Sequence, residues 1–80
     1  MTDKSDIEKL QILLDHWIDH NHSHEAEMDK WRKVAAEAGQ KEAAAKIREA
    51  IAAMRETDQA LSKALESLGG PPTGHHHHHH

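Results

Sequence analysis

Hydrophobic residues recur along the first half of the chain at alternating steps of three and four positions. This spacing is typical of one face of an α-helix, because residues three and four apart lie above one another. A second run with the same spacing follows after residue 40, and each run is expected to pack on a partner helix as its core face. The first run comprises Ile7, Leu10, Leu14, Trp17, Asn21, His24, Met28, Trp31, Ala35 and Ala38, and the second comprises Ala44, Ile47, Ile51, Met54, Asp58, Leu61, Leu65 and Leu68.

Residues with strong local preferences mark where the first helix should begin and end. Ser5 and Glu8 have the spacing of a capping box, in which each side chain accepts a backbone N–H of the first turn. Gly39 suits the left-handed conformation that often closes a helix. The pattern therefore predicts a first helix over residues 6–38 and a turn at 39–40.

The second helix is predicted over residues 41–68, because Gly69-Gly70-Pro71 cannot continue it. So short a turn makes the two helices antiparallel neighbours, and residues 1–70 are predicted to form an all-α hairpin. In a lone hairpin each helix packs on the other along one line of residues, which we call its seam. A second stripe of residues on the first helix would then stay in water. This stripe favours a homodimer that forms a four-helix bundle. The residues of the stripe are Leu13, His20, Glu27 and Val34.

Both seams are interrupted by polar residues near their middle. Asn21 and His24 interrupt the first and Asp58 the second. With the turn at 39–40, residues that face each other should have numbers that sum to about 79, so Asn21 should face Asp58. The polar groups would then share one internal layer, which avoids the cost of an unpaired buried group.

That layer has the residue types of a metal site. His20 and His24 are four apart on one helical face, and Glu27 lies three further on. Nitrogen and oxygen donors without sulfur suit a divalent transition metal such as Zn²⁺ or Ni²⁺. Asp58 could supply a carboxylate across the hairpin, or hold an imidazole from behind together with Asn21.

Other interpretations of the same residues remain open. The polar layer could serve only to fix the register and oligomeric state of a helical interaction module. His16 could join His20 as a further ligand or remain a surface histidine, and His22 is expected to face solvent. Arg55 could pair with Glu27 and so remove it from the ligands. A catalytic role is not predicted, since Met28 stands where a zinc-protease motif starting at His24 needs its second histidine.

Composition narrows the class of protein further. Asp and Glu number 14 against 10 Lys and Arg, a formal net charge of −4 that disfavours nucleic acid as a partner. Cysteine is absent, and no apolar run is long enough to cross a membrane, so a cytoplasmic protein is expected. Residues 71–80, which end in the histidine run 75–80, are interpreted as a linker and an affinity tag, with a natural metal-binding tail as the alternative.

The run Leu13-Leu14-Asp15-His16-Trp17-Ile18-Asp19-His20-Asn21, with His24 and Trp31 after it, resembles a family of small helical domains. These domains carry a Leu-Leu-x-His-Trp-Ile-x-His-Asn-x-x-His motif and occur alone or fused to nickel-binding proteins of the CooT type. The resemblance implies that His16, His20 and His24 bind nickel or a related metal, with Asn21 beside them. It also implies a nickel-handling protein as a possible partner. Asp58 departs from the family pattern, which tends to have asparagine there.

Overall fold

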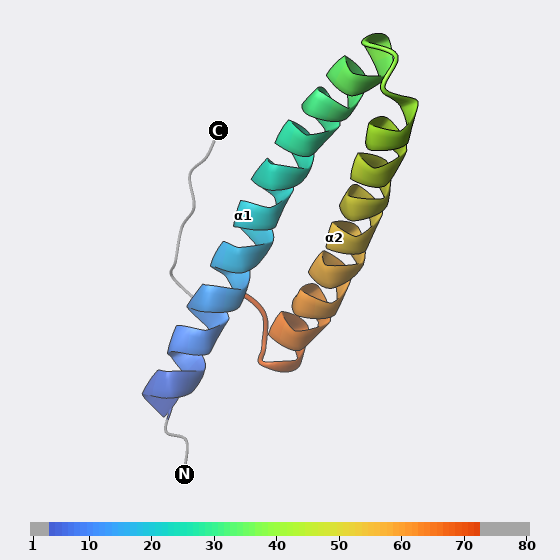
Figure 1. The fold of residues 1–80 in the computed structure, drawn as a ribbon. Helices are drawn as coiled ribbons and strands as arrows, with labels where there is room; N and C mark the ends of the chain where they lie inside the picture. Colours follow the sequence, from blue (N-terminus) through green and yellow to red (C-terminus); the bar gives the residue numbers. More distant parts are fainter. Residues whose placement is uncertain (1–3, 73–80) are drawn as a thin grey trace.

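The computed structural model describes residues 4–72, which form an antiparallel pair of α-helices (Figure 1). Helix α1 spans Lys4–Glu37 and α2 spans Lys41–Ser67. The predicted all-α hairpin is therefore confirmed, with helix ends within one or two residues of those expected. Ser5 lies inside α1, so the predicted capping box does not start the helix. The tag assigned to the histidine run 75–80 lies outside the described residues.

The turn between the helices is closed by Gly39, as predicted. Its φ angle is 82°, in the left-handed region that glycine adopts without strain. The Gly39 N–H donates to Ala36 O at 3.1 Å and the Gln40 N–H donates to Ala35 O at 2.9 Å, which together form a Schellman motif. Because this turn fixes where α2 starts, it also fixes which residues of the two helices face each other.

Replacement of Gly39 by alanine is expected to lower the free energy of unfolding by about 1 kcal/mol. The added Cβ would meet no atom within 4 Å, so the cost comes from the left-handed backbone and not from a clash. The Gly39→Asn variant should lose less, since asparagine tolerates this conformation better. Urea unfolding followed by circular dichroism measures both changes, and equal losses in the two variants would contradict this explanation.

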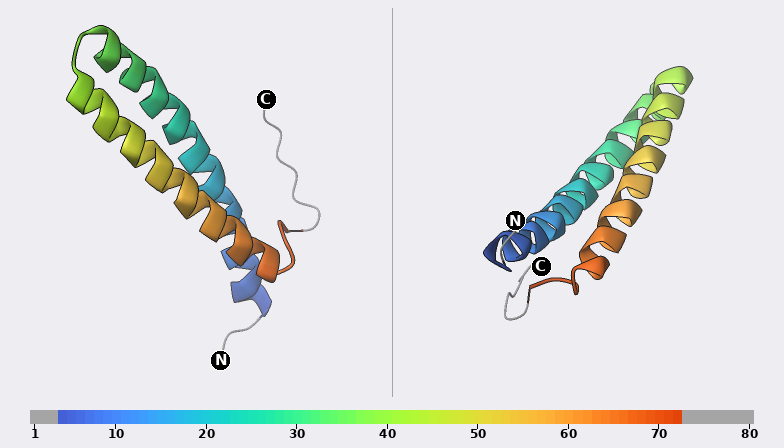
Figure 2. Two further views of the ribbon diagram at one scale, coloured as in Figure 1. Left: turned by 90° about the vertical axis from the view of Figure 1, so that its right-hand side faces the viewer. Right: turned by 90° about the horizontal axis from the view of Figure 1, so that it is seen from below.

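The core runs along the seam predicted for α2. Its buried hydrophobic side chains are Leu14 from α1 and Ala44, Ile51 and Leu65 from α2. The other α2 seam residues are half-buried, apart from Asp58, which is buried. Figure 2 shows the helices side by side in two further views, with the first turns of α1 extending past the end of α2.

The seam of α1 differs from the prediction at every second position. Leu10, Trp17 and Trp31, which were expected in the core of the hairpin, are 37%, 41% and 53% exposed, and His24 is exposed as well. In each case the next residue along the chain faces α2 instead. The seam therefore keeps the predicted residues at positions 7, 14, 21, 28 and 35, but the large apolar side chains predicted between them face away from α2. The residues that face α2 are Ile7, Gln11, Leu14, Ile18, Asn21, Glu25, Met28, Arg32 and Ala35, all buried or half-buried.

Gln11 supplies a physical reason for this rotation. Its side-chain amide donates to Leu68 O at 2.9 Å and to Gly70 O at 3.1 Å, beyond the last turn of α2. Carbonyls at a helix C-terminus have no partner within the helix, so an amide that reaches them stabilises this end of the hairpin. With Gln11 turned inward, Leu10 lies beside the seam.

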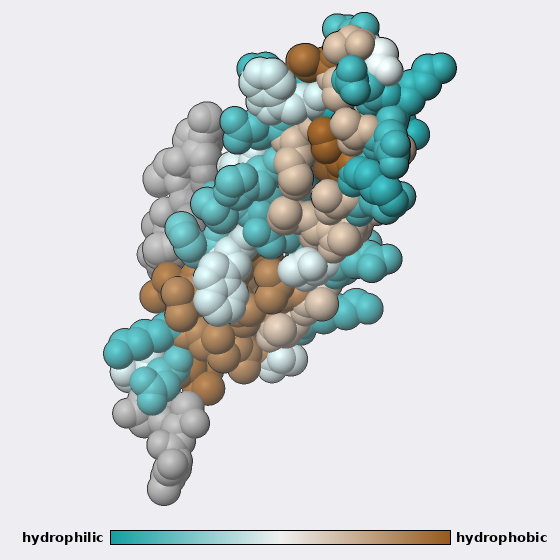
Figure 3. Space-filling model, viewed as in Figure 1, coloured by the Kyte–Doolittle hydropathy of each residue, from teal (hydrophilic) through white to brown (hydrophobic). Residues whose placement is uncertain are grey.

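The rotation leaves an apolar stripe on the outside of α1, interrupted in its middle by His20, His24 and Glu27. Its large side chains are Leu10, Leu13, Trp17, Trp31 and Val34, each at least 37% exposed. In Figure 3 hydrophobic side chains gather on the lower part of one face, and a weakly hydrophobic band continues along α2. We call the stripe of α1 through these five large side chains the apolar face. Neither helix in residues 4–72 has a stretch long and hydrophobic enough for a membrane span.

Candidate functional site

The polar layer at the middle of the hairpin forms as the register predicted. Asn21 Nδ2 donates to Asp58 Oδ1 at 2.8 Å, and these residue numbers sum to 79. Asp58 is 6% exposed and is the buried polar residue of the described core. A carboxylate held this deep is stabilised by the amide, since an unpaired buried acceptor is costly. The layer therefore joins the two helices at one defined position.

Three predicted ligands, His16, His20 and His24, line the apolar face of α1. Their side chains are exposed and succeed one another turn by turn along the helix. The Nε2 atoms of His20 and His24 are 3.0 Å apart, and the rings of His16 and His20 are stacked with centroids 6.1 Å apart. Glu27, the fourth predicted ligand, is also exposed, one turn beyond His24.

The separation of the two Nε2 atoms is that of two ligands on one ion. Nitrogens bound at 2.0–2.1 Å to a metal, at angles of 90–110°, lie about 2.9–3.4 Å apart. Without a metal, the same contact requires that one imidazole donates and the other accepts. The arrangement therefore suits either a shared metal ion or one hydrogen bond between the two rings.

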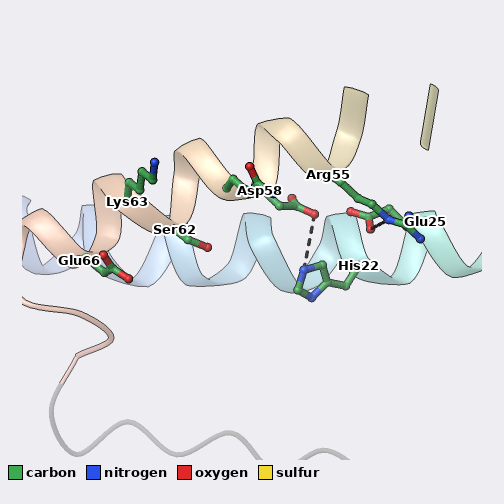
Figure 4. A pocket seen from close by; sticks show the side chains of 8 residues that line it. His22, Glu25, Arg55, Asp58, Ser62, Lys63 and Glu66 are labelled. Carbon is green, nitrogen blue, oxygen red and sulfur yellow. Dashed lines mark ion pairs between the residues drawn. The ribbon is translucent and has the colours of Figure 1, made fainter. Parts of the chain in front are cut away.

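A second group of polar side chains lies beside Asp58 and was not predicted. His22 Nε2 is 3.5 Å from Asp58 Oδ2, and one ligand atom each from His22, Glu25 and Asp58 lie within 4.8 Å of one another (Figure 4). His22 and Glu25 come from α1 and Asp58 from α2. We call these three residues the carboxylate cluster. They line an open groove of about 550 Å³ that continues toward Ser62 and Lys63.

The Asp58 carboxylate affects the ionisation of Glu25. A hydrogen bond with Asp58 raises the pKa of the Glu25 carboxyl, and burial adds to the effect, while the charges of His22 and Arg55 oppose it. Such a bond exists only when one of the two groups holds a proton. When both are ionised, the buried atoms Glu25 Oε2 and Asp58 Oδ2 have no hydrogen-bond donor.

The structure gives two of these polar residues partners that were not predicted. His22 faces solvent as expected, with 61% of its side chain exposed, and its ring also pairs with Asp58. Arg55 was considered as a partner of Glu27, but its Nε lies 3.7 Å from Glu25 Oε1. Both pairs follow from the rotated seam, which brings Glu25 inward and leaves Glu27 outside. Asn21, Glu25 and Met28 have heptad spacing, but so do Asn21, His24 and Met28, and spacing alone could not place Glu25 inside.

The fold and the polar layer define a small all-α hairpin protein. It has His16, His20 and His24, which we call the histidine stripe, on one side and the carboxylate cluster on the other. The chain belongs to the family described as "Domain of unknown function (DUF8180)", whose family model matches residues 10–68. The matched segment contains the histidine stripe, the turn and the whole seam of α2. No match was found among the curated proteins or among the solved structures.

Proposed function

We propose that this protein binds a divalent transition-metal ion, nickel or zinc, through the imidazoles of His20 and His24. The observation that carries the proposal is the 3.0 Å separation of their Nε2 atoms on an exposed helix face. Two imidazoles held one turn apart on a rigid helix lose little freedom when they close on an ion. The resemblance to domains associated with nickel-binding proteins points to the same class of ligand.

Further ligands are available on the same stripe. His16 stacks on His20 from the preceding turn, and Glu27 lies one turn after His24. Either could complete the coordination together with water, or a second copy of the chain could do so. An exposed site with open positions suits the handling or sensing of a metal, because the ion can be loaded and passed on.

The proposal predicts saturable metal binding that depends on two histidines. The chain with the histidine run 75–80 replaced by serine should bind Ni²⁺ or Zn²⁺ with a dissociation constant on the order of 1 μM, about −8.2 kcal/mol. His20→Ala with His24→Ala should weaken this binding by about 100-fold, or about 2.7 kcal/mol. Isothermal titration calorimetry measures the affinity, and circular dichroism checks that helicity is retained.

The matched control is Lys30→Ala with Lys33→Ala, which alters two exposed residues of α1 away from the histidines. Its affinity for either metal should equal that of the parent. A parent that shows no binding at micromolar metal would overturn the proposal. The proposal would also fail if the double histidine variant kept every binding event of the parent, each with unchanged affinity.

A helical dimerisation module is the second candidate function. The apolar face supports it, because large hydrophobic side chains are seldom left together in water on a monomer of this size. The small exposed residues of α2 would allow another helix to approach closely; they include Ala50, Thr57 and Ala64. A second copy seated on the apolar face would also bring two histidine stripes together.

Dimerisation predicts that a charge on the apolar face changes the mass in solution. At tens of micromolar the parent should sediment as a dimer, and Trp17→Glu should sediment as a monomer, since one carboxylate would be buried unpaired in the interface. The control Glu56→Gln alters an exposed polar residue and should leave the mass unchanged. Analytical ultracentrifugation without metal tests this candidate independently of metal binding, and a monomeric parent would contradict it.

A further inference from the structure

We infer that the carboxylate cluster of His22, Glu25 and Asp58 is a second divalent-metal site, separate from the pair His20 and His24. His22 is two residues from each of those histidines, and two residues turn a helix by about 200°. The histidine stripe and the carboxylate cluster therefore lie on different sides of α1. The inference does not depend on the function proposed for the stripe.

The buried carboxylate of Asp58 is the first observation that carries this inference. Only 8% of its side chain is exposed, and Asn21 occupies Oδ1 while Oδ2 has no hydrogen-bond donor. Oδ2 instead faces the ring of His22 across 3.5 Å (Figure 4). If the polar layer served only to fix the register of the two helices, the hydrogen bond from Asn21 to Asp58 would be sufficient. The unpaired oxygen requires a proton or a cation, since burial of a free carboxylate is costly.

Glu25 supplies the second carboxylate in the same way. Its side chain is 12% exposed, Arg55 lies 3.7 Å from Oε1, and Oε2 is buried without a hydrogen-bond donor. The two free oxygens, Glu25 Oε2 and Asp58 Oδ2, thus belong to neighbouring carboxylates from different helices. Two carboxylates with ligand atoms within 4.8 Å of each other, in a partly desolvated environment, repel each other when both are ionised. A divalent cation between them would remove the repulsion and satisfy both oxygens.

The donor set indicates the class of metal. One imidazole nitrogen and two carboxylate oxygens suit Zn²⁺ and related first-row ions, and two carboxylates balance the charge of a divalent ion. The separation of 3.5 Å between His22 and Asp58 is already close to that of two ligands on one ion, and the exposed His22 ring can rotate to complete the site. A fourth position would open to the groove, where Arg55 and Lys63 could attract an anionic ligand of the metal.

A chain without the first site and without the histidine run tests the inference. His20→Ala and His24→Ala remove the stripe, and serine replaces the histidine run 75–80. Calorimetry with Zn²⁺, and visible absorption with Co²⁺ as the probe, should show one ion bound per chain. Glu25→Gln and His22→Ala should each weaken this binding by about 100-fold. His22→Ala alters a side chain that is 61% exposed, so folding should persist.

The matched control is Glu66→Gln, which removes a carboxylate from the same groove outside the cluster. It should leave the affinity unchanged. A second readout uses no metal: Glu25→Gln should raise the melting temperature at neutral pH, because it removes the repulsion between the carboxylates, whereas Glu66→Gln should not.

Two results would overturn the inference. The background chain could bind no Zn²⁺ at concentrations well above micromolar, in which case a proton alone bridges the carboxylates. Alternatively, its binding could survive both Glu25→Gln and His22→Ala. Neither result bears on the stripe, which is tested with His22, Glu25 and Asp58 intact, so failure of one site is distinguishable from failure of the other.

Discussion

Leu14→Ala is expected to lower the free energy of unfolding by about 3 kcal/mol, the largest loss from any single truncation on α1. Leu14 is 4% exposed and is the buried hydrophobic side chain that α1 contributes to the core. Alanine there would remove apolar contacts and leave a cavity, and the straight helices on either side cannot collapse into it. For a domain of this size the loss corresponds to a melting temperature roughly 10–20 °C lower.

Leu13→Ala is the matched control for this prediction. Leu13 is the same residue type on the same helix, but it is 45% exposed on the apolar face. In dilute solution its truncation should cost less than about 1 kcal/mol, because little apolar area is lost from the hairpin itself. Thermal unfolding monitored at 222 nm compares the two variants. A larger loss for Leu13→Ala in a monomeric sample would contradict the described seam.

Asn21→Leu alone is expected to destabilise the protein by about 2–4 kcal/mol, although leucine is apolar and suits a core position. The change removes the donor to Asp58 Oδ1 and leaves a buried carboxylate with two unsatisfied oxygens. Asn21→Leu with Asp58→Leu should recover the stability of the parent or exceed it, since a well-packed apolar pair replaces a buried polar one. Asp58→Leu alone should cost less than Asn21→Leu, because no charge is left behind.

Urea unfolding of the parent, both single variants and the double variant forms a double-mutant cycle that measures the coupling between these residues. If the layer also sets the oligomeric state, the double variant should populate more than one species in analytical ultracentrifugation. A coupling energy near zero would contradict the bond between Asn21 and Asp58, and a single unchanged oligomer would count against a role in assembly.

The pairing of Asn21 with Asp58 could be predicted from sequence because it depends on local signals. Gly39 sets the turn, both helices carry heptad spacing, and the register then follows by counting. The all-α hairpin and the seam of α2 follow from the same signals. Each of these predictions uses only the period of a helix and the shortest connection between two of them.

The side of α1 that faces α2 could not be predicted in this way. The stripe through Leu10, Trp17 and Trp31 and the seam through Gln11 and Ile18 have the same spacing, and hydrophobicity favours the former. The structure places the latter inside, where the Gln11 amide reaches Leu68 O, 57 residues away along the chain. A contact at that separation has no signature in a helical period.

The carboxylate cluster was missed for the same reason. His22 lies outside the seam in either arrangement, and its ring meets Asp58 only because the helices pack with Glu25 turned inward. The candidate ligands His20 and His24 are less sensitive to this rotation. Their contact lies within one helix, at a spacing of four residues, and needs no partner from α2.

The proposed metal site requires that one ion binds the Nε2 atoms of both His20 and His24. Long-range proton–nitrogen NMR spectra of the imidazoles, recorded on the ¹⁵N-labelled chain with the run 75–80 replaced by serine, resolve each ring nitrogen during a Zn²⁺ titration. We predict that the Nε2 resonances of His20 and His24 move together and stop moving once the site is saturated. If both Nε2 resonances keep their positions at saturating Zn²⁺, the proposed site is contradicted.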